Sequence, residues 1–243
     1  MVDRTKACRN SPAVFAADHT CAAIIPCRNE AGRIGEVVRG VRRYLSTVIV
    51  VDDASEDETG PEARRAQAVV LRHATCDGKG AAFITAWQEA KQRGFQWVLH
   101  MDGDGQHAPA DVPRFLEAST GRASLVIGNR FENPNAIPWK RRVVNRWMSR
   151  RLSLLTGATF PDSQCGFRLV HLQTVLSLPI RTRHFEIESE LCVAFARAGK
   201  EIQFIPVEAR YGDEVSKISP IQDAFRWWKW YAAECKHPPR FTS

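Results

Sequence analysis

The chain has 243 residues, 44% of them hydrophobic and 25% charged, which is the balance of an ordinary globular protein with a substantial core. No apolar run approaches the roughly 18 residues of a membrane-spanning helix, and the N-terminal segment lacks the apolar centre of a secretory signal peptide. The 7 cysteines include no C-x-x-C pair, which argues against a disulfide framework and a zinc site. We therefore expect a cytoplasmic protein whose thiols are reduced and mostly buried.

The formal net charge of +7 favours an anionic partner, such as nucleic acid, a phosphorylated metabolite or an anionic membrane surface. Much of this charge is concentrated in residues 140–151, KRRVVNRWMSRR, where 6 basic residues occur without an acidic one. Apolar side chains are interleaved with them, at Val143, Val144, Trp147 and Met148. The segment therefore has the pattern of a basic amphipathic helix.

Strands and helices are predicted to alternate along the chain. In order, strand 21–26 is followed by helix 34–45, strand 47–53 by helix 57–66, strand 68–72 by a helix with apolar residues from 83 to 90, strand 95–102 by a helix that begins at Pro109, and then strand 124–130. This order predicts an α/β, doubly wound, mostly parallel sheet with its ligand site at the carboxyl ends of the strands. We expect one domain over residues 20–243, with a loose arm at 1–19.

Carboxylates follow three of the predicted strands. Asp102 and Asp104 lie one residue apart in HMDGDGQH, Asp52 and Asp53 end the second strand, and Glu30 lies just past the first. Small hard cations such as Mg²⁺ or Mn²⁺ prefer a carboxylate or two together with water and phosphate oxygens. The plainer interpretations are an acidic turn at 102–105 and a strand leading into a capped helix at 52–57.

Other ligand motifs are missing. The first strand is followed by PCRNE and not by G-x-G-x-x-G, and the chain has no G-x-x-x-x-G-K-[ST]. The calcium-loop pattern also fails after Asp102, because Gln106, His107 and Pro113 stand at its fifth, sixth and twelfth positions. The sequence therefore gives no support to nicotinamide, P-loop or calcium-loop binding.

PCRNE, VVDDASEDETG, GKGAA, DGDGQH, GNR and DSQCGFR, in this order, resemble the motifs of the inverting nucleotide-sugar glycosyltransferases of family 2, which have the GT-A fold. The resemblance covers residues 21–230, and is strongest to polyprenyl-phosphate sugar synthases of the dolichyl-phosphate mannose synthase type, to which the Gln-His after D-x-D also points. It implies a nucleotide-sugar half at about 20–130 and an acceptor half at about 131–243.

The resemblance also implies roles for individual residues. The donor would be bound by Pro26, Glu30, Asp52, Asp53, Lys79 and Asp102. A Mg²⁺ or Mn²⁺ ion would be held by Asp102, Asp104 and Gln106. The acceptor phosphate would be held by Arg130, Arg168 and Lys217. Asp162 would organise the acceptor side, and Glu186 and Glu188 lie where relatives with hydroxyl acceptors have a catalytic carboxylate.

Two mechanisms follow from these roles. The oxygen of a lipid phosphate is already anionic and needs no general base, only positive charge to hold it near the anomeric carbon of the donor. Transfer to a hydroxyl would instead use Asp162, Glu186 or Glu188 as the base. For each charged residue, a structural ion pair or a helix-end charge is the alternative interpretation.

A membrane surface is the expected partner beside the nucleotide-sugar and the polyprenyl phosphate or other lipid acceptor, which would make the enzyme peripheral at the inner face of the membrane. Besides helix 140–151, the C-terminal segment mixes aromatic and basic residues. One stripe of it is expected to dock on the core, namely Ile221, Ala224, Phe225, Trp228 and Tyr231. Trp227 and Trp230 lie off that stripe and are the predicted membrane contacts. A nucleic-acid-binding protein is the alternative from another class, and the acidic sheet edge argues against it.

Overall fold

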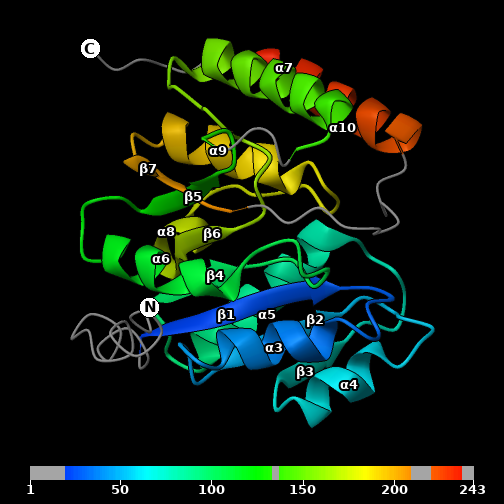
Figure 1. Ribbon diagram of the computed structural model, residues 1–243. Coiled ribbons are helices and arrows are strands. Elements are labelled where there is room, and N and C mark those ends of the chain that lie inside the picture. Colours follow the sequence, from blue (N-terminus) through cyan, green and yellow to red (C-terminus); the bar gives the residue numbers. More distant parts are fainter. Residues whose placement is uncertain (1–19, 133–136, 209–219, 237–243) are drawn as a thin grey trace.

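The computed structural model describes residues 20–132, 137–208 and 220–236 (Figure 1). The predicted arm at 1–19 and Lys217 lie outside the described residues. The strands are β1 (Cys21–Cys27), β2 (Val48–Asp52), β3 (Val69–Arg72), β4 (Trp97–His100), β5 (Leu125–Asn129), β6 (Arg168–His171) and β7 (Ile202–Pro206). The helices are α3 (Ile34–Val41), α4 (Thr59–Arg65), α5 (Lys79–Gln92), the short 3-10 helix η1 (Pro109–Asp111), α6 (Val112–Ala118), α7 (Trp139–Thr156), α8 (Leu172–Ser177), α9 (Ile187–Arg197) and α10 (Pro220–Cys235).

All 7 strands form one sheet in the order β3-β2-β1-β4-β6-β5-β7. The pairs β2–β3, β1–β2, β1–β4 and β5–β7 are parallel, whereas β6 runs antiparallel to both of its neighbours, β4 and β5. The predicted α/β, mostly parallel sheet is therefore confirmed. Because β6 and β7 belong to the part of the chain after residue 130, the sheet joins the two predicted halves.

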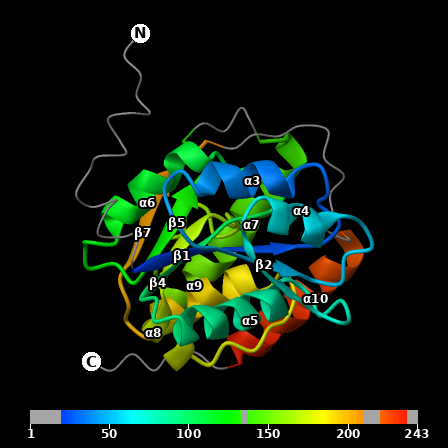
Figure 2. The ribbon, with the colours of Figure 1, turned by 90° about the horizontal axis from the view of Figure 1, so that it is seen from below.

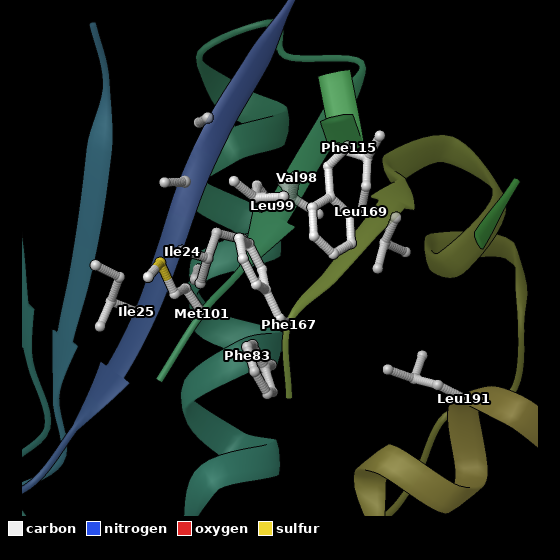
Figure 3. Packing of buried hydrophobic residues seen from close by; sticks show 14 of the residues in the cluster. Ile24, Ile25, Phe83, Val98, Leu99, Met101, Phe115, Phe167, Leu169 and Leu191 are labelled. Atoms are coloured by element: carbon white, nitrogen blue, oxygen red, sulfur yellow. The ribbon is translucent and has the colours of Figure 1, made fainter. Parts of the chain in front are cut away.

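Helices cover both faces of the sheet. In Figure 2, α3, α4 and α6 lie on one side of it, and α5, α8 and α9 lie on the other. This explains why β1 is buried at all 7 positions and reads as the continuous apolar run CAAIIPC. Between the layers, the rings of Phe115 and Phe167 pack with centroids 4.2 Å apart, close to Leu99 and Leu169 (Figure 3). Burying each such side chain contributes about 1.5–3 kcal/mol to folding.

The C-terminal helix α10 docks by a different face from the predicted one. Trp227 is only 5% exposed, and its indole Nε1 donates a hydrogen bond to Ser189 Oγ at 2.9 Å. Tyr231, one turn later, is also buried and stacks on Trp227 with centroids 5.0 Å apart. Phe225 and Trp228, by contrast, are 69% and 51% exposed.

The predictions for this helix were therefore wrong for most of its aromatic residues, and right for Tyr231. The helix is turned so that the indole of Trp227 reaches a hydroxyl partner on α9, which an apolar stripe chosen by hydrophobicity alone does not anticipate. Trp230, the other predicted membrane contact, is partly buried and packs against the core. The side chain of Ile221 lies outside the described part of the structure, and Ala224 is exposed.

Candidate active site

The loops that follow β1 and β2 are tied to each other. Asn29 donates its backbone N–H to Ser55 Oγ at 3.0 Å and accepts a hydrogen bond from the Glu56 backbone on its own Oδ1 at 2.8 Å. Asn29 and Ala54 both have left-handed backbones, with φ of 51° and 56°. For Ala54 this conformation is costly and persists only where surrounding contacts impose it. The two strand ends thus form one rigid rim.

Asp52 has a structural set of partners. Its side chain is fully buried, forms an ion pair with Arg72 and accepts a hydrogen bond from the Ser55 backbone at 2.9 Å. Every one of these contacts is within the β2–β3 layer. Asp52 therefore shapes the loop after β2, and any contact with a nucleoside would come through that loop.

Asp53 holds the segment that leads into α5. Its carboxylate accepts hydrogen bonds from the backbone N–H groups of Asp77 and Gly78 at 2.9 and 2.8 Å, and contacts His73 Nδ1 at 2.8 Å. Burial by itself would raise the pKa of Asp53, but these hydrogen bonds hold it below its usual value. These hydrogen bonds from the backbone to Asp53 fix the position of the glycine-flanked segment in which Lys79 lies.

Pro26 and Glu30 lie along the same rim. Pro26 is a buried residue of β1, and Glu30 is 6% exposed. A Cβ placed on Gly103 would lie 3.4 Å from Glu30 Cγ, so the D-G-D turn packs directly against the loop after β1. The two acidic loops predicted to share one sheet edge are therefore adjacent.

Lys79 connects the two halves of the chain. Its Nζ lies 2.6 Å from Asp102 Oδ1 and 2.6 Å from Glu188 Oε1, and it is flanked by the rings of Phe83 and Phe185. Burial would lower the pKa of Lys79, but the two carboxylates raise it well above its usual range. One ammonium therefore neutralises Asp102, which follows β4, and Glu188, which lies in α9.

The D-x-D turn places its two carboxylates differently. Burial would raise the pKa of Asp102, yet Lys79 and His107 hold it well below its usual range. The pKa of Asp104 is raised, by burial and by the charge of Asp102. Asp104 Oδ1 accepts a hydrogen bond from the Gln106 backbone at 2.9 Å. Negative charge at Asp104 is therefore crowded, which is the condition that a bound cation relieves.

The fit of a divalent cation follows from these donors. Among the described residues, no group of three or more His, Cys, Asp or Glu side chains forms a metal cluster. Two carboxylates with hard oxygen donors match Mg²⁺ or Mn²⁺, which take the rest of their ligands from water and substrate phosphates. Asp102 and Asp104 are the residues that would hold the ion, with Gln106 beside them in the same turn.

Gly166, in the DSQCGFR motif, touches the D-x-D turn directly. A Cβ at this position would clash with Asp102 Oδ2 and lie 3.0 Å from Asp102 Cγ. Only glycine allows this loop to approach the carboxylate so closely. The sequence shows this glycine inside the DSQCGFR motif, but it does not show that the glycine contacts Asp102.

Arg130 and Asp162 form a buried pair. Arg130 Nε lies 2.7 Å from Asp162 Oδ2 and Arg130 Nη2 lies 2.9 Å from Oδ1, a bidentate arrangement. Asp162 is fully buried and Arg130 is 8% exposed. The structure thus brings these two predicted acceptor-side residues together.

Arg168 does not lie where the sequence interpretation placed it. It is 1% exposed, and its guanidinium donates to the backbone carbonyls of Ser163, Cys165 and Glu188 at 2.8, 2.7 and 2.7 Å. A guanidinium occupied in this way clamps the DSQCGFR loop to the start of α9. Arg168 therefore acts on the site through the position of that loop, and the expectation that it contacts the acceptor is corrected.

The acids at the start of α9 have separate environments. Glu190, which the sequence interpretation missed, accepts hydrogen bonds from the backbones of Arg181 and Thr182 at 3.0 and 2.9 Å. It thereby holds the loop that packs on Gly80. Glu186 is 8% exposed, and its Oε2 has no hydrogen-bond partner among the described residues.

A mostly parallel sheet whose strand ends carry a D-x-D turn, a buried lysine and a paired arginine defines the GT-A class of glycosyltransferase. Residues 22–174 match the family described as Glycosyl transferase family 2, and the chain belongs to that family. It is therefore a glycosyltransferase, as the sequence motifs predicted.

Several curated relatives are polyprenyl-phosphate sugar transferases. The chain is 31% identical over 197 residues to the undecaprenyl-phosphate mannosyltransferase of Micrococcus luteus, which covers 76% of this chain and 81% of the relative. It is 29% identical over 177 residues to the polyprenol monophosphomannose synthase of Mycolicibacterium smegmatis, covering 68% and 67%.

Solved structures confirm the fold. Glucosyl-3-phosphoglycerate synthase from Mycobacterium tuberculosis, in complex with Mn²⁺, UDP-glucose and phosphoglyceric acid, superimposes with a TM-score of 0.72 at 18% identity, over 94% of this chain and 83% of that one. The same protein with Mn²⁺ and UDP-glucose gives a TM-score of 0.73 at 18% identity, over 97% and 84%. Among the described residues, no helix is long and apolar enough to cross a membrane.

Proposed function

We propose that this chain transfers a sugar, with inversion, from a nucleoside diphosphate sugar to the phosphate of a polyprenyl phosphate, with a Mg²⁺ or Mn²⁺ ion held by Asp102 and Asp104. The names of the relatives from Micrococcus luteus and Mycolicibacterium smegmatis support this acceptor class. The neighbour that binds Mn²⁺ with UDP-glucose supports the donor and the metal.

One observation on the site carries the choice of acceptor. Two of the acids that would serve as a general base are already ion-paired, Glu188 with Lys79 and Asp162 with Arg130. Each of these carboxylates is already engaged by a cation, which leaves it less available to contact and deprotonate an acceptor hydroxyl. An acceptor that arrives as an anion needs no such base, which matches a phosphate and not an alcohol.

In the proposed reaction, a phosphate oxygen of the acceptor forms a bond to the anomeric carbon as the bond to the leaving diphosphate breaks. The electron pair of the broken bond leaves with the nucleoside diphosphate, and no proton moves at the acceptor. When bound, the divalent cation supplies positive charge to that leaving group. Lys79 fixes Asp102, and the Arg130–Asp162 pair shapes the acceptor side.

Glu186 favours a second candidate, transfer to a hydroxyl on a lipid or glycan. Its buried Oε2 has no hydrogen-bond partner in the described part of the chain, so this carboxylate is the acid still available to accept a proton. In that case Glu186→Gln should abolish transfer. Under the phosphate proposal the same change should leave most of the transfer in place.

The test uses the purified chain, Mn²⁺ or Mg²⁺, a panel of radiolabelled GDP- and UDP-sugars, and short-chain polyprenyl phosphate beside polyprenol. Transfer to the phosphate alone supports the proposal and identifies the sugar, whereas transfer to the alcohol refutes it. Asp104→Ala should lower transfer by about a hundredfold or more with the fold intact. Glu36→Ala, an exposed acid on α3, is the matched control.

A further inference from the structure

We propose that the outer faces of α7 and α10 form a docking surface for an anionic lipid bilayer. Seven large hydrophobic side chains are exposed in the described part of the chain, and all of them lie on these two helices: Trp139, Val143, Val144, Trp147, Leu154, Phe225 and Trp228. Their exposed fractions run from 41% to 70%. A concentration of exposed apolar residues on one face marks a surface that meets a partner.

The two helices lie together at the top of Figure 1, on the far side of the molecule from α4. Trp147 of α7 and Trp228 of α10 stack with ring centroids 6.1 Å apart and an interplanar angle of 19°. Tyr231 Oη also reaches the backbone carbonyl of Arg151 at 3.5 Å. The exposed residues of both helices therefore belong to one continuous surface.

The exposed apolar residues of α7 share one side of the helix with its exposed basic residues. Trp139, Val143, Trp147 and Leu154 are spaced by 4, 4 and 7 residues, which places them on one side of a helix. The buried residues Ser149, Leu152 and Thr156 lie on the opposite side. The exposed basic residues Lys140, Arg146, Arg150 and Arg151 lie on the same side of the helix, interspersed with the exposed apolar residues. A helix that presents apolar and basic side chains together suits the headgroup region of a bilayer.

Charge selects a bilayer over other partners. Helix α7 has no acidic residue, and the two acids of α10 are both paired, Asp223 with Arg226 and Glu234 with Arg197. A second copy of the same face would bring like charges together. Nucleic acid would match the basic residues, but its phosphates would leave the exposed apolar residues without a partner. In an anionic bilayer, the headgroups pair with the basic side chains and the acyl layer accepts the apolar ones.

The inference concerns where the acceptor half meets its lipid, and it deepens the proposed function by naming a membrane partner. It rests on the proposed function because a polyprenyl phosphate acceptor resides in a bilayer. Vesicle binding is measured without turnover, so the docking proposal and the acceptor proposal are tested by separate experiments.

The test is sedimentation of the full chain with phosphatidylcholine vesicles, with and without roughly a third of phosphatidylglycerol. Binding should require the anionic lipid and weaken with salt. The apolar variant replaces three highly exposed residues: Trp139→Ser, Val143→Ser and Leu154→Ser. It should lower the partition coefficient at least tenfold, while transfer to a short-chain acceptor without vesicles is retained.

A charge variant separates the two contributions. Lys140→Gln, Arg146→Gln and Arg150→Gln together should weaken binding about a hundredfold, at about fivefold for each charge. The matched control removes three exposed charges elsewhere: Arg43→Gln, Lys91→Gln and Arg122→Gln. The control variant should weaken binding much less, because its three residues are exposed but lie outside the docking surface.

Three outcomes would overturn the proposal. They are no sedimentation of the wild type with anionic vesicles, equal losses in the charge variant and its control, or a dimer in solution that the apolar variant dissociates. Circular dichroism shows whether each variant is folded. If the apolar variant is not folded, the single change Leu154→Ser replaces it, at a side chain that is 70% exposed.

Discussion

Replacing Lys79 with methionine should destabilise the protein by about 3–5 kcal/mol, the cost of removing one partner from a buried ion pair. The side chain of Lys79 is 11% exposed, and those of Asp102 and Glu188 are 26% and 10% exposed. Both carboxylates lie 2.6 Å from the same ammonium. Without it, two acids face one another with little access to water.

Urea unfolding followed by circular dichroism measures this cost in the presence of a chelator. Lys91→Met, an exposed lysine on α5, is the matched control and should change stability by less than about 0.5 kcal/mol. Adding Glu188→Gln to Lys79→Met removes one of the two unpaired charges and should restore part of the loss. The two changes should therefore be non-additive by at least 0.5 kcal/mol.

Divalent cations give an independent readout. In Lys79→Met, Asp102 lacks its ammonium, so Mn²⁺ should raise the stability of the variant more than that of the wild type, by the amount that linkage predicts from its affinity. A loss below about 1 kcal/mol, the scale of an exposed ion pair, would refute the reasoning. Equal stabilisation of both proteins by Mn²⁺ would contradict the proposal that Lys79 lies beside the residues that hold the metal.

Three further outcomes are expected. Asp162→Asn should lower the free energy of unfolding by about 3–5 kcal/mol in urea, because Arg130 would stay buried without its carboxylate, and adding Arg130→Gln should then cost little more. Gly166→Ala should displace the first D-x-D carboxylate and lower both Mn²⁺ binding, measured by titration, and transfer, with little loss of secondary structure. Trp227→Phe removes a buried indole hydrogen bond and should cost about 1 kcal/mol in thermal unfolding, whereas the exposed Trp228→Phe should be nearly neutral.

The parallel strands could be predicted because burial on both faces leaves a plain signal. β1 and β2 read as continuous apolar runs, CAAIIPC and VIVVD, bounded by polar loops. β6 lacks such a signal, since it has 4 residues and begins with the buried Arg168. Its place in the sheet is set by pairing with β4 and β5, which are distant in the sequence, and not by local pattern.

The sequence predicted candidate residues for the site, but it did not predict which of them contact each other. Lys79, Asp102 and Glu188 were all candidates, and the contact between Lys79 and Glu188 joins residues 109 positions apart. The neighbours Asp52 and Asp53 read as one acidic pair, but Asp52 ends β2 and pairs with Arg72, whereas Asp53 begins the loop after it and binds the backbone of residues 77 and 78. Sequence patterns record which groups are present, and the fold decides which of them neutralise each other.

The reversed direction of β6 explains how two halves of the chain meet at one site. A parallel strand ends at the carboxyl edge of the sheet, whereas an antiparallel neighbour begins there. His100, the last residue of β4, pairs with Arg168, the first residue of β6. The chain must therefore pass the end of β4 before it enters β6, and the residues that do so are those of the DSQCGFR motif. This is why Gly166 lies against Asp102, and why a strand that interrupts the parallel order of the sheet is the element that brings the second half of the chain to the D-x-D turn.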